Sequence, residues 1–314
     1  MKMTDRGKMQ RQILGLIGAG VMGRTVAERW LQAGYSLFVF DVSHVAHEKV
    51  RALGATVAAN LRAVAERADV MIMFLPGPKQ VRACVAGSEG LLSAARPGSV
   101  IVDMSTVDPG TSRDMWDLAK AAGVGYLDAP VLGRPATVGK WTLPIGGMQE
   151  DIERCAPIFD LIAARCIPIG GPGSGNKIKL LNQLMFSAIN AMTAEMMAVS
   201  EKVGIAPRLL YETITASQAG TVSNLFKELG QKIVADNFED PTFSVDLLCK
   251  DVRLAVEMAQ EAKAPPLLAR TIQFVNEMAQ SQGFGASDTA IMWKSFSRIW
   301  GSNACDAAVN RTAR

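Results

Sequence analysis

Three glycines with the spacing G-x-G-x-x-G, Gly18, Gly20 and Gly23, lie in the segment ILGLIGAGVMG. The apolar run before them predicts a short buried strand over 13–17, and the run after them predicts a helix over 22–33. Glycines in such a turn allow a tight bend, a close approach of the backbone to a pyrophosphate, and close packing of helix on strand. The N–H groups of the first helical turn would then face the phosphates of a dinucleotide.

An acidic residue stands where a dinucleotide site needs one. The next expected strand, YSLFVFD, ends in Asp41, 23 residues beyond Gly18. A carboxylate there hydrogen-bonds a ribose 2′-hydroxyl and repels a 2′-phosphate, and the following Val42 and Ser43 supply no arginine, so we expect NAD in preference to NADP. The alternative is a structural glycine-rich turn followed by an incidental acid. The predicted cofactor-binding residues of this motif are Gly18, Ala19, Gly20, Val21, Met22, Gly23 and Asp41.

Hydride transfer to or from a nicotinamide needs a group that exchanges a proton with the reacting oxygen. The two histidines, His44 and His47, follow the second expected strand on the adenosine side, and we expect them at the surface. A different centre is offered by Lys179, Asn182 and Gln183, which stand at i, i+3 and i+4. This spacing places them on one face of a helix.

The remainder of that helix is apolar nearly all round, which predicts that it is buried. A lysine and an amide on a buried helix are costly without partners, so Lys179 and Asn182 become functional candidates. Lys177 points about 200° away from Lys179, because each helical residue advances about 100°. The alternative is a Lys–Asn pair that caps an interdomain junction. The apolar residues behind this prediction are Leu180, Leu181, Leu184, Met185, Ile189, Met192 and Met196.

The elements around these motifs alternate between strand and helix. Helical composition over 43–66 and 78–96 separates short apolar runs, which is typical of a doubly wound parallel sheet. Ligands of such sheets bind beyond the carboxyl ends of the strands, and we expect Ser105, which lies there, to contact the substrate. The strand-end candidates are Leu75, Pro76, Ser105 and Thr106, and the expected strands after the first two cover 69–76, 98–106, 125–133 and 142–147.

The pattern of apolar and polar residues changes after GGPGSG, residues 170–175. Beyond it there is scarcely any strand signal, and the glycines mark a domain boundary. We therefore expect a disordered leader over 1–11, a Rossmann domain over 12–172, and an all-α domain over 173–314. The expected helices of the last part cover 176–203, 207–216, 222–235, 244–263 and 265–280.

Composition narrows the class of protein. The 314 residues, with a net charge of +3, contain no basic run interleaved with aromatics, which argues against nucleic acid. Five cysteines without C-x-x-C pairs, and only two histidines, argue against a metal site and indicate buried thiols in a reducing compartment. The N-terminus MKMTDRGKMQRQ lacks an apolar signal, and the longest apolar region contains asparagine and glutamate. We expect a cytoplasmic protein that binds no membrane.

The chain resembles the β-hydroxyacid dehydrogenase family, which includes 3-hydroxyisobutyrate dehydrogenase and tartronate semialdehyde reductase and is related to 6-phosphogluconate dehydrogenase. The match covers about residues 12–298 and rests on GLIGAGVMG, FLPGPKQV, VDMSTVDPG, LDAPVLGRP, GSGNKIKLLNQ, LLCKD and GFGASD. The resemblance implies an active site between the two domains and a homodimer or homotetramer. It implies hydride transfer between NAD and a small 3-hydroxy acid.

The resemblance also implies roles for single residues. Lys179 becomes the general acid/base, and Asn182, with Gln183, holds the substrate. Lys250 becomes a cofactor contact, together with Leu75, Pro76 and Thr106, although a lysine beside an acid on a helix is otherwise typical of solvated surface.

Two motifs depart from the family pattern. Where the family has Ser-Gly-Gly for the substrate carboxylate, this chain has Leu132, Gly133 and Arg134, and K-x-x-N-N becomes K-x-x-N-Q at Gln183. Arg134 either binds an acidic substrate in bidentate fashion or points to solvent. Two further readings of the chain are an imine-reducing relative and a dinucleotide sensor without turnover.

Overall fold

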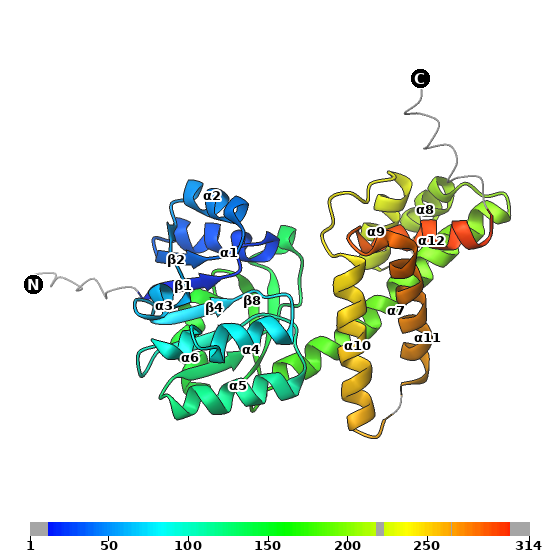
Figure 1. Ribbon diagram of the computed structural model, residues 1–314. Helices are drawn as coiled ribbons and strands as arrows, with labels where there is room; N and C mark the ends of the chain where they lie inside the picture. The colour runs from blue at the N-terminus through cyan, green and yellow to red at the C-terminus, as the bar shows by residue number, and fades with distance from the viewer. Residues whose placement is uncertain (1–11, 218–222, 265, 302–314) are drawn as a thin grey trace, which may run out of the picture. The chain divides into compact units, whose positions relative to one another are not determined.

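A computed structural model gives the fold of the chain (Figure 1). The chain forms two compact units that meet between Lys179 and Leu180. No helix among the described residues is long and apolar enough to cross a membrane. The expected leader and Cys305 lie outside the described residues. The structure describes residues 12–217, 223–264 and 266–301.

The first unit is built on a single eight-stranded sheet of order β3-β2-β1-β4-β5-β6-β7-β8. All neighbouring strands pair in parallel except β6 and β7, so the expected doubly wound α/β architecture is confirmed with one antiparallel pair. The strands are β1 (Ile13–Ile17), β2 (Ser36–Phe40), β3 (Thr56–Val57), β4 (Val70–Met73), β5 (Val100–Asp103), β6 (Gly125–Asp128), β7 (Trp141–Gly146) and β8 (Ala163–Gly170).

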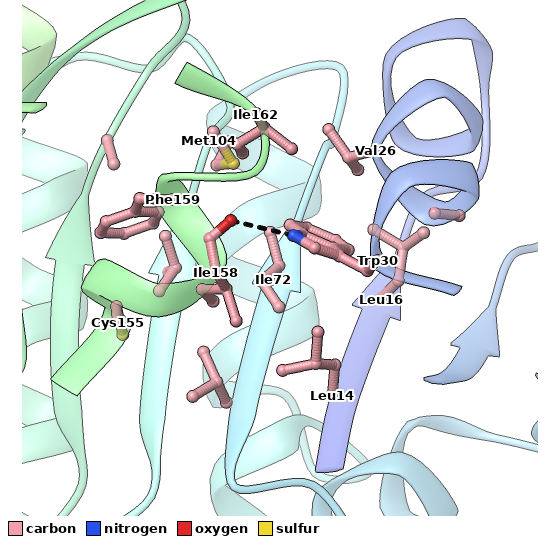
Figure 2. Packing of buried hydrophobic residues seen from close by; sticks show 14 of the residues in the cluster. Leu14, Leu16, Val26, Trp30, Ile72, Met104, Cys155, Ile158, Phe159 and Ile162 are labelled. Atoms are coloured by element: carbon pink, nitrogen blue, oxygen red, sulfur yellow. Dashed lines mark hydrogen bonds between the residues drawn. The ribbon is translucent and has the colours of Figure 1, made fainter. Parts of the chain in front are cut away.

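Helices cover both faces of this sheet. Side chains of α1, α2 and α6 join one buried cluster, and side chains of α3, α4 and α5 join the cluster on the other face. Figure 2 shows Trp30 of α1 in the first cluster, where its indole N–H donates to the carbonyl oxygen of Ile158 in α6 at 3.0 Å. The helices are α1 (Val21–Gln32), α2 (His44–Ala52), α3 (Leu61–Ala65), α4 (Pro78–Ala86), α5 (Pro109–Ala121) and α6 (Gln149–Phe159).

The second unit is helical throughout its described residues, as expected. Its core gathers large apolar side chains such as Met197, Phe226 and Leu248 from different helices. Helix α7 begins in the first unit, and the division between the units falls within it. The helices are α7 (Ser174–Lys202), α8 (Pro207–Ala216), α9 (Asn224–Val234), α10 (Val245–Glu261), α11 (Leu267–Ala279) and α12 (Met292–Ile299).

The expectation that α7 is buried all round is wrong. Leu180 is fully buried against Leu254 of α10, but Leu181, Met185 and Met192 are 55%, 63% and 62% exposed. These three residues recur at i, i+4 and i+11, which is one side of a helix. Apolar composition alone does not bury a helix face, because burial requires another element to pack on it.

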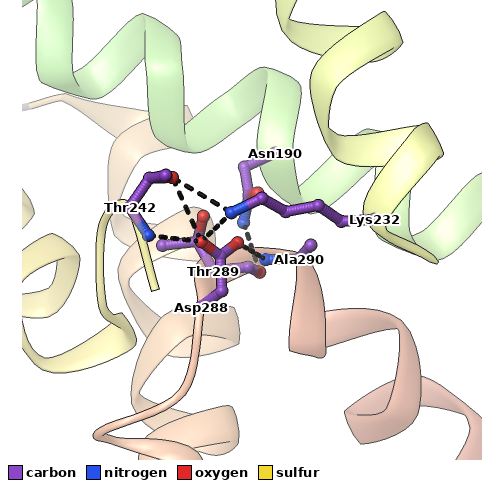
Figure 3. Close-up of polar contacts among 6 residues, drawn as sticks. All are labelled: Asn190, Lys232, Thr242, Asp288, Thr289 and Ala290. Carbon is purple, nitrogen blue, oxygen red and sulfur yellow. Dashed lines mark hydrogen bonds and ion pairs between the residues drawn. The ribbon is translucent and has the colours of Figure 1, made fainter. Parts of the chain in front are cut away.

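A buried ion pair ties elements of the second unit together (Figure 3). Asp288 is 1% exposed and pairs with Lys232 of α9. Its carboxylate oxygens also accept the backbone N–H groups of Thr242 at 3.0 Å and Ala290 at 3.1 Å. The pair therefore joins α9 to two loops that are distant in sequence.

Candidate functional site

The glycine loop joins β1 to α1 with the geometry that a dinucleotide requires. Gly18 has φ +88, and a Cβ there would collide with the carbonyl oxygen of Phe74, while a Cβ on Gly23 would collide with that of Gly18. Gly20 faces open space, with no heavy atom within 4 Å of an added Cβ. Because α1 begins at Val21, a phosphate beside Gly20 would meet the N–H groups of its first turn. These residues fit the NAD(P) pyrophosphate.

Asp41 lies beside this loop, directly after β2. Its carboxylate accepts the backbone N–H of Ala19 at 2.6 Å through one oxygen and that of Ser43 at 2.8 Å through the other. His44 is exposed, and a ring nitrogen of His47 lies 2.7 Å from the Asp41 carbonyl oxygen. Asp41 is thus anchored to the glycine loop, and each carboxylate oxygen keeps a further lone pair for a ribose hydroxyl.

The expected strand-end residues lie after β4 and β5, at the carboxyl edge of the sheet. The Ser105 hydroxyl accepts the backbone N–H of Leu75 at 2.9 Å, and the Ser105 N–H donates to Asp103 at 2.9 Å. Pro76 is exposed and Thr106 is half-buried. Ser105, predicted to contact substrate, is 3% exposed and joins the two strand-end loops.

Lys179 and the residues after β6 come together within the first unit. The Lys179 ammonium donates to the carbonyl oxygen of Val131 at 2.9 Å and is half-buried, whereas Lys177 is exposed. Val131 belongs to the DAPVLGR segment, in which the sequence places substrate contacts. The candidate acid/base and the candidate substrate loop are therefore in direct contact.

The loop after Val131 is held by its backbone. Leu132 exchanges two hydrogen bonds with Thr142, at 3.0 and 3.2 Å, and the Arg134 carbonyl accepts the Trp141 indole N–H at 2.7 Å. The Trp141 ring packs against Gly133, where a Cβ would collide with it. The Leu132 side chain and the half-buried Arg134 side chain therefore extend from a loop whose backbone conformation is held by these hydrogen bonds.

Two buried polar residues, Asp128 at the end of β6 and Asn176 in the first turn of α7, were not predicted from the sequence. The Asp128 carboxylate accepts the backbone N–H groups of Gly173 at 2.7 Å and Asn176 at 2.8 Å. Burial raises the pKa of Asp128 to about 7, against the lowering effect of those two N–H groups. The sequence signal was present, since an acid ends the strand in LDAP and an asparagine follows the glycines in GSGN.

The remaining predicted residues gather around Asp251 in the second unit. Gln183, which is 4% exposed, donates its amide to Asp251 at 2.6 Å, and the Lys250 ammonium pairs with the other Asp251 oxygen at 2.6 Å. The Asn182 amide donates to the Gln183 side-chain oxygen at 3.4 Å. Asp251 was not predicted, although it directly follows Lys250 in CKD. The Asp251 carboxylate therefore holds the Gln183 amide and the Lys250 ammonium next to each other.

No three His, Cys, Asp or Glu side chains in the described part of the chain gather as ligands for a metal ion. The described cysteines are free thiols, and of these Cys84, Cys155 and Cys249 are buried and Cys166 is half-buried. The polar groups of the candidate residues include the ammonium groups of Lys179 and Lys250, the Arg134 guanidinium, side-chain amides and backbone N–H groups. Such groups move protons and hold carboxylates or phosphates.

Known proteins match both units of the chain. Residues 13–171 match the family described as the NAD binding domain of 6-phosphogluconate dehydrogenase. Residues 173–296 match the family described as NAD-binding of NADP-dependent 3-hydroxyisobutyrate dehydrogenase.

Similar proteins extend over most of the chain. A 2-(hydroxymethyl)glutarate dehydrogenase of Eubacterium barkeri is 31% identical, over 93% of this chain and 98% of its own. An NAD-dependent L-serine dehydrogenase of Pseudomonas aeruginosa is 29% identical, over 90% and 97%. The crystal structure of a 3-hydroxyisobutyrate dehydrogenase from Salmonella typhimurium superimposes with a TM-score of 0.84 at 27% identity, over 90% and 99%.

Proposed function

Because the chain belongs to the β-hydroxyacid dehydrogenase family of NAD(P)-dependent oxidoreductases, we propose that it interconverts a small 3-hydroxy acid and its semialdehyde, with Lys179 as general acid/base. The observation that carries this proposal is the bond from the half-buried Lys179 ammonium to the Val131 carbonyl oxygen at 2.9 Å. It places the lysine against the loop in which substrate contacts are expected.

The names of the relatives support the substrate class. 2-(Hydroxymethyl)glutarate, L-serine and 3-hydroxyisobutyrate all have a CH₂OH group on the carbon that bears a carboxylate. A substrate of this kind presents an alcohol to the acid/base and a carboxylate to the binding loop. We propose that Arg134 and the backbone N–H of Gly133 receive that carboxylate.

The proposed reaction transfers one hydride and one proton. In oxidation, the neutral Lys179 amine accepts the proton of the alcohol O–H while the carbinol carbon gives up its hydride. In reduction, the Lys179 ammonium gives its proton to the carbonyl oxygen as hydride arrives. Bound NAD(H) supplies and accepts the hydride, and positioned acid–base catalysis contributes about 10²–10⁴ in rate. The Val131 carbonyl oxygen holds the Lys179 Nζ atom in place while it changes protonation state.

We propose NAD as the preferred dinucleotide. Asp41 stands at the end of β2 beside the glycine loop and is bonded to the Ala19 N–H at 2.6 Å. An acid there accepts a hydrogen bond from a ribose 2′-hydroxyl and repels a 2′-phosphate.

The test is an oxidation assay with NAD and a panel of C3 to C5 3-hydroxy acids at alkaline pH, followed by NADH absorbance. We expect turnover with at least one acid. The kcat of Lys179→Ala should be about 10²–10⁴-fold lower than that of the wild type, and the variant should still bind NADH. Lys177→Ala is the matched control, since Lys177 is an exposed lysine two residues away on the same helix, and its kcat should stay near that of the wild type.

Two outcomes would contradict the proposal. The lysine assignment would fall if Lys177→Ala abolished turnover and Lys179→Ala did not. If no hydroxy acid were oxidised but cyclic imines were reduced with the same dinucleotide, the imine-reducing reading would replace it.

A further inference from the structure

We infer that Asp128 is a positioning residue for Lys179: its buried carboxylate caps the first turn of α7 from the end of β6 and thereby fixes the helix that bears the lysine. The inference rests on the proposed function only in taking Lys179 as the acid/base. Asp128 itself is 0% exposed, so we place its carboxylate behind the reacting groups and not against substrate or cofactor.

The cap comes from a distant part of the sequence. The Asp128 oxygens accept the N–H groups of Gly173 and Asn176, which lie 45 and 48 residues further along the chain. The first N–H groups of a helix have no partner within the helix, and a negative charge there also complements the helix dipole. The Asp128 side chain therefore supplies the acceptors that the start of α7 needs.

Glycines bring the helix start directly onto the sheet. A Cβ on Gly175 would lie 2.5 Å from the carbonyl oxygens of both Asp128 and Pro144. Gly173 has φ +86, and a Cβ there would lie 2.7 Å from the carbonyl oxygen of Pro109. This packing leaves no room for the first turn to shift toward β6 or β7. The hydrogen bonds of Asp128 keep the turn from shifting away, so the separation between the first turn of α7 and the end of β6 is fixed.

Asn176 ties the same turn to a second loop. Its side chain is fully buried, accepts the backbone N–H of Val107 at 3.1 Å, and donates to the Ser112 hydroxyl at 3.2 Å. Val107 directly follows Thr106, a predicted cofactor contact. The first turn of α7 is therefore fixed both to the end of β6 and to the loop after β5.

The lysine closes the arrangement. Val131 lies three residues after Asp128 in the segment that leaves β6, and Asn176 and Lys179 lie three residues apart in one helix. Asp128 joins this segment to the helix at Asn176, and the Val131 carbonyl joins it again at the Lys179 ammonium. A displacement of the first turn would move Nζ relative to this segment, and misplacement by about 1 Å can cost a reaction on the order of 10²-fold.

The experiment compares Asp128→Asn with the wild-type enzyme in the NAD-linked assay, using an acid that the panel identifies. An amide has the size of the carboxylate but offers one acceptor oxygen for two N–H groups. We expect kcat to fall about 10- to 100-fold, with KM for the acid and Kd for NADH within about threefold of wild type. Lys179→Ala/Asp128→Asn should have the kcat of Lys179→Ala alone, because no base is left to position.

The control is Asp69→Asn. Asp69 also bridges two segments of the first unit, accepting the Ile13 N–H at 2.7 Å and pairing with Arg96 at 2.8 Å, but it touches no candidate site residue. The Asp69→Asn substitution should lower the midpoint of thermal unfolding without lowering kcat. Asn176→Ala is a second variant that leaves the Asp128 carboxylate intact, and it should show the same selective loss of kcat in milder form.

The outcomes separate the inference from the proposed function. If Lys179→Ala loses turnover while folded Asp128→Asn and Asn176→Ala keep kcat within twofold of wild type, the inference is overturned and the function stands. If kcat, KM and NADH affinity all worsen together, Asp128 is structural only and the inference is overturned. If Lys179→Ala keeps wild-type turnover, the proposed function fails, and the positioning role fails with it.

Discussion

At the scale of single residues, we propose Asp41 as the determinant of the choice between NAD and NADP. We expect a higher kcat/KM with NAD than with NADP, because a 2′-phosphate would lie against this carboxylate. Asp41→Asn removes the repulsion, keeps an acceptor for the Ala19 N–H, and should narrow the ratio of the two kcat/KM values. Glu48→Gln removes the same charge from the exposed surface of α2 and should leave the ratio unchanged. An equal or higher kcat/KM of the wild type with NADP would contradict the assignment.

Arg134 lies where the sequence departs from the Ser-Gly-Gly pattern of the family, and we propose that it contacts the substrate. If its guanidinium binds the substrate carboxylate, Arg134→Ala should raise KM for the acid by roughly ten- to a hundredfold, since a hydrogen bond to a charged group contributes about 1.5–3 kcal/mol. NAD affinity should be unchanged. Lys140→Ala removes an exposed cation from the same β6–β7 connection and should leave KM unaltered. An unchanged KM in Arg134→Ala would leave the carboxylate to the backbone N–H of Gly133.

Local spacing was enough to predict some of these residues and not others. The turn at Gly18 and Gly23 is contained within one loop, so its shape could be read from the sequence. Asp128 and Asp251 differ, because each acts on groups 45 or more residues away, at Gly173 and Gln183. Such contacts exist only once strands and helices have assembled, so the sequence shows where these acids stand but not which groups they bind.

At the scale of elements, the start of α7 links stability to pH through Asp128. Burial raises the pKa of its carboxyl to about 7 from an ordinary value of 3.8, and the facing Asp103 raises it further, while the N–H groups of Asn176 and Gly173 lower it. The buried Tyr126 hydroxyl donates to Asp103 beside it. The folded state therefore binds the proton more tightly than the unfolded state does, and stability from this group is complete below pH 3.8 and lost as pH rises through 7.

The expected result is a pH-dependent difference between two proteins. From pH 5 to pH 8, the free energy of unfolding of the wild type should fall by roughly 2.5 kcal/mol relative to that of Asp128→Asn, which has no proton to lose there. Urea unfolding at several pH values measures this difference. A constant difference between the two proteins across the range would show that the carboxylate is already ionised at pH 5.

The hydrophobic pattern of the sequence did not predict three features of the sheet. The expected helical stretch 43–66 is broken at Gly54, which has φ +98, and the short β3 follows before Asn60 caps α3. Strand β8 was not predicted because it lies at the sheet edge with most of its residues exposed, and so lacks a buried run. Strand β7 runs antiparallel to β6 because no crossover helix separates them, and parallel pairing needs one.

At the scale of the whole molecule, each unit has a hydrophobic core of its own. The first unit buries two clusters against the faces of its sheet, and the core of the second unit lies among its helices. Units with separate cores can unfold in separate steps. We therefore expect two transitions in calorimetry, and a core substitution in one unit should lower the transition of that unit alone.

The buried pair of Asp288 and Lys232 provides the test of this independence. Asp288→Asn leaves the ammonium, whose side chain is 18% exposed, without its charged partner, so the second unit should lose about 3–5 kcal/mol. Asp236→Asn is the matched control: its carboxylate pairs with Lys294 at 2.7 Å but is 58% exposed, and surface pairs contribute about 0–1 kcal/mol. Asp69→Asn should lower only the transition of the first unit. A single transition that both Asp288→Asn and Asp69→Asn shift would mean that the continuous helix α7 couples the two cores into one cooperative system.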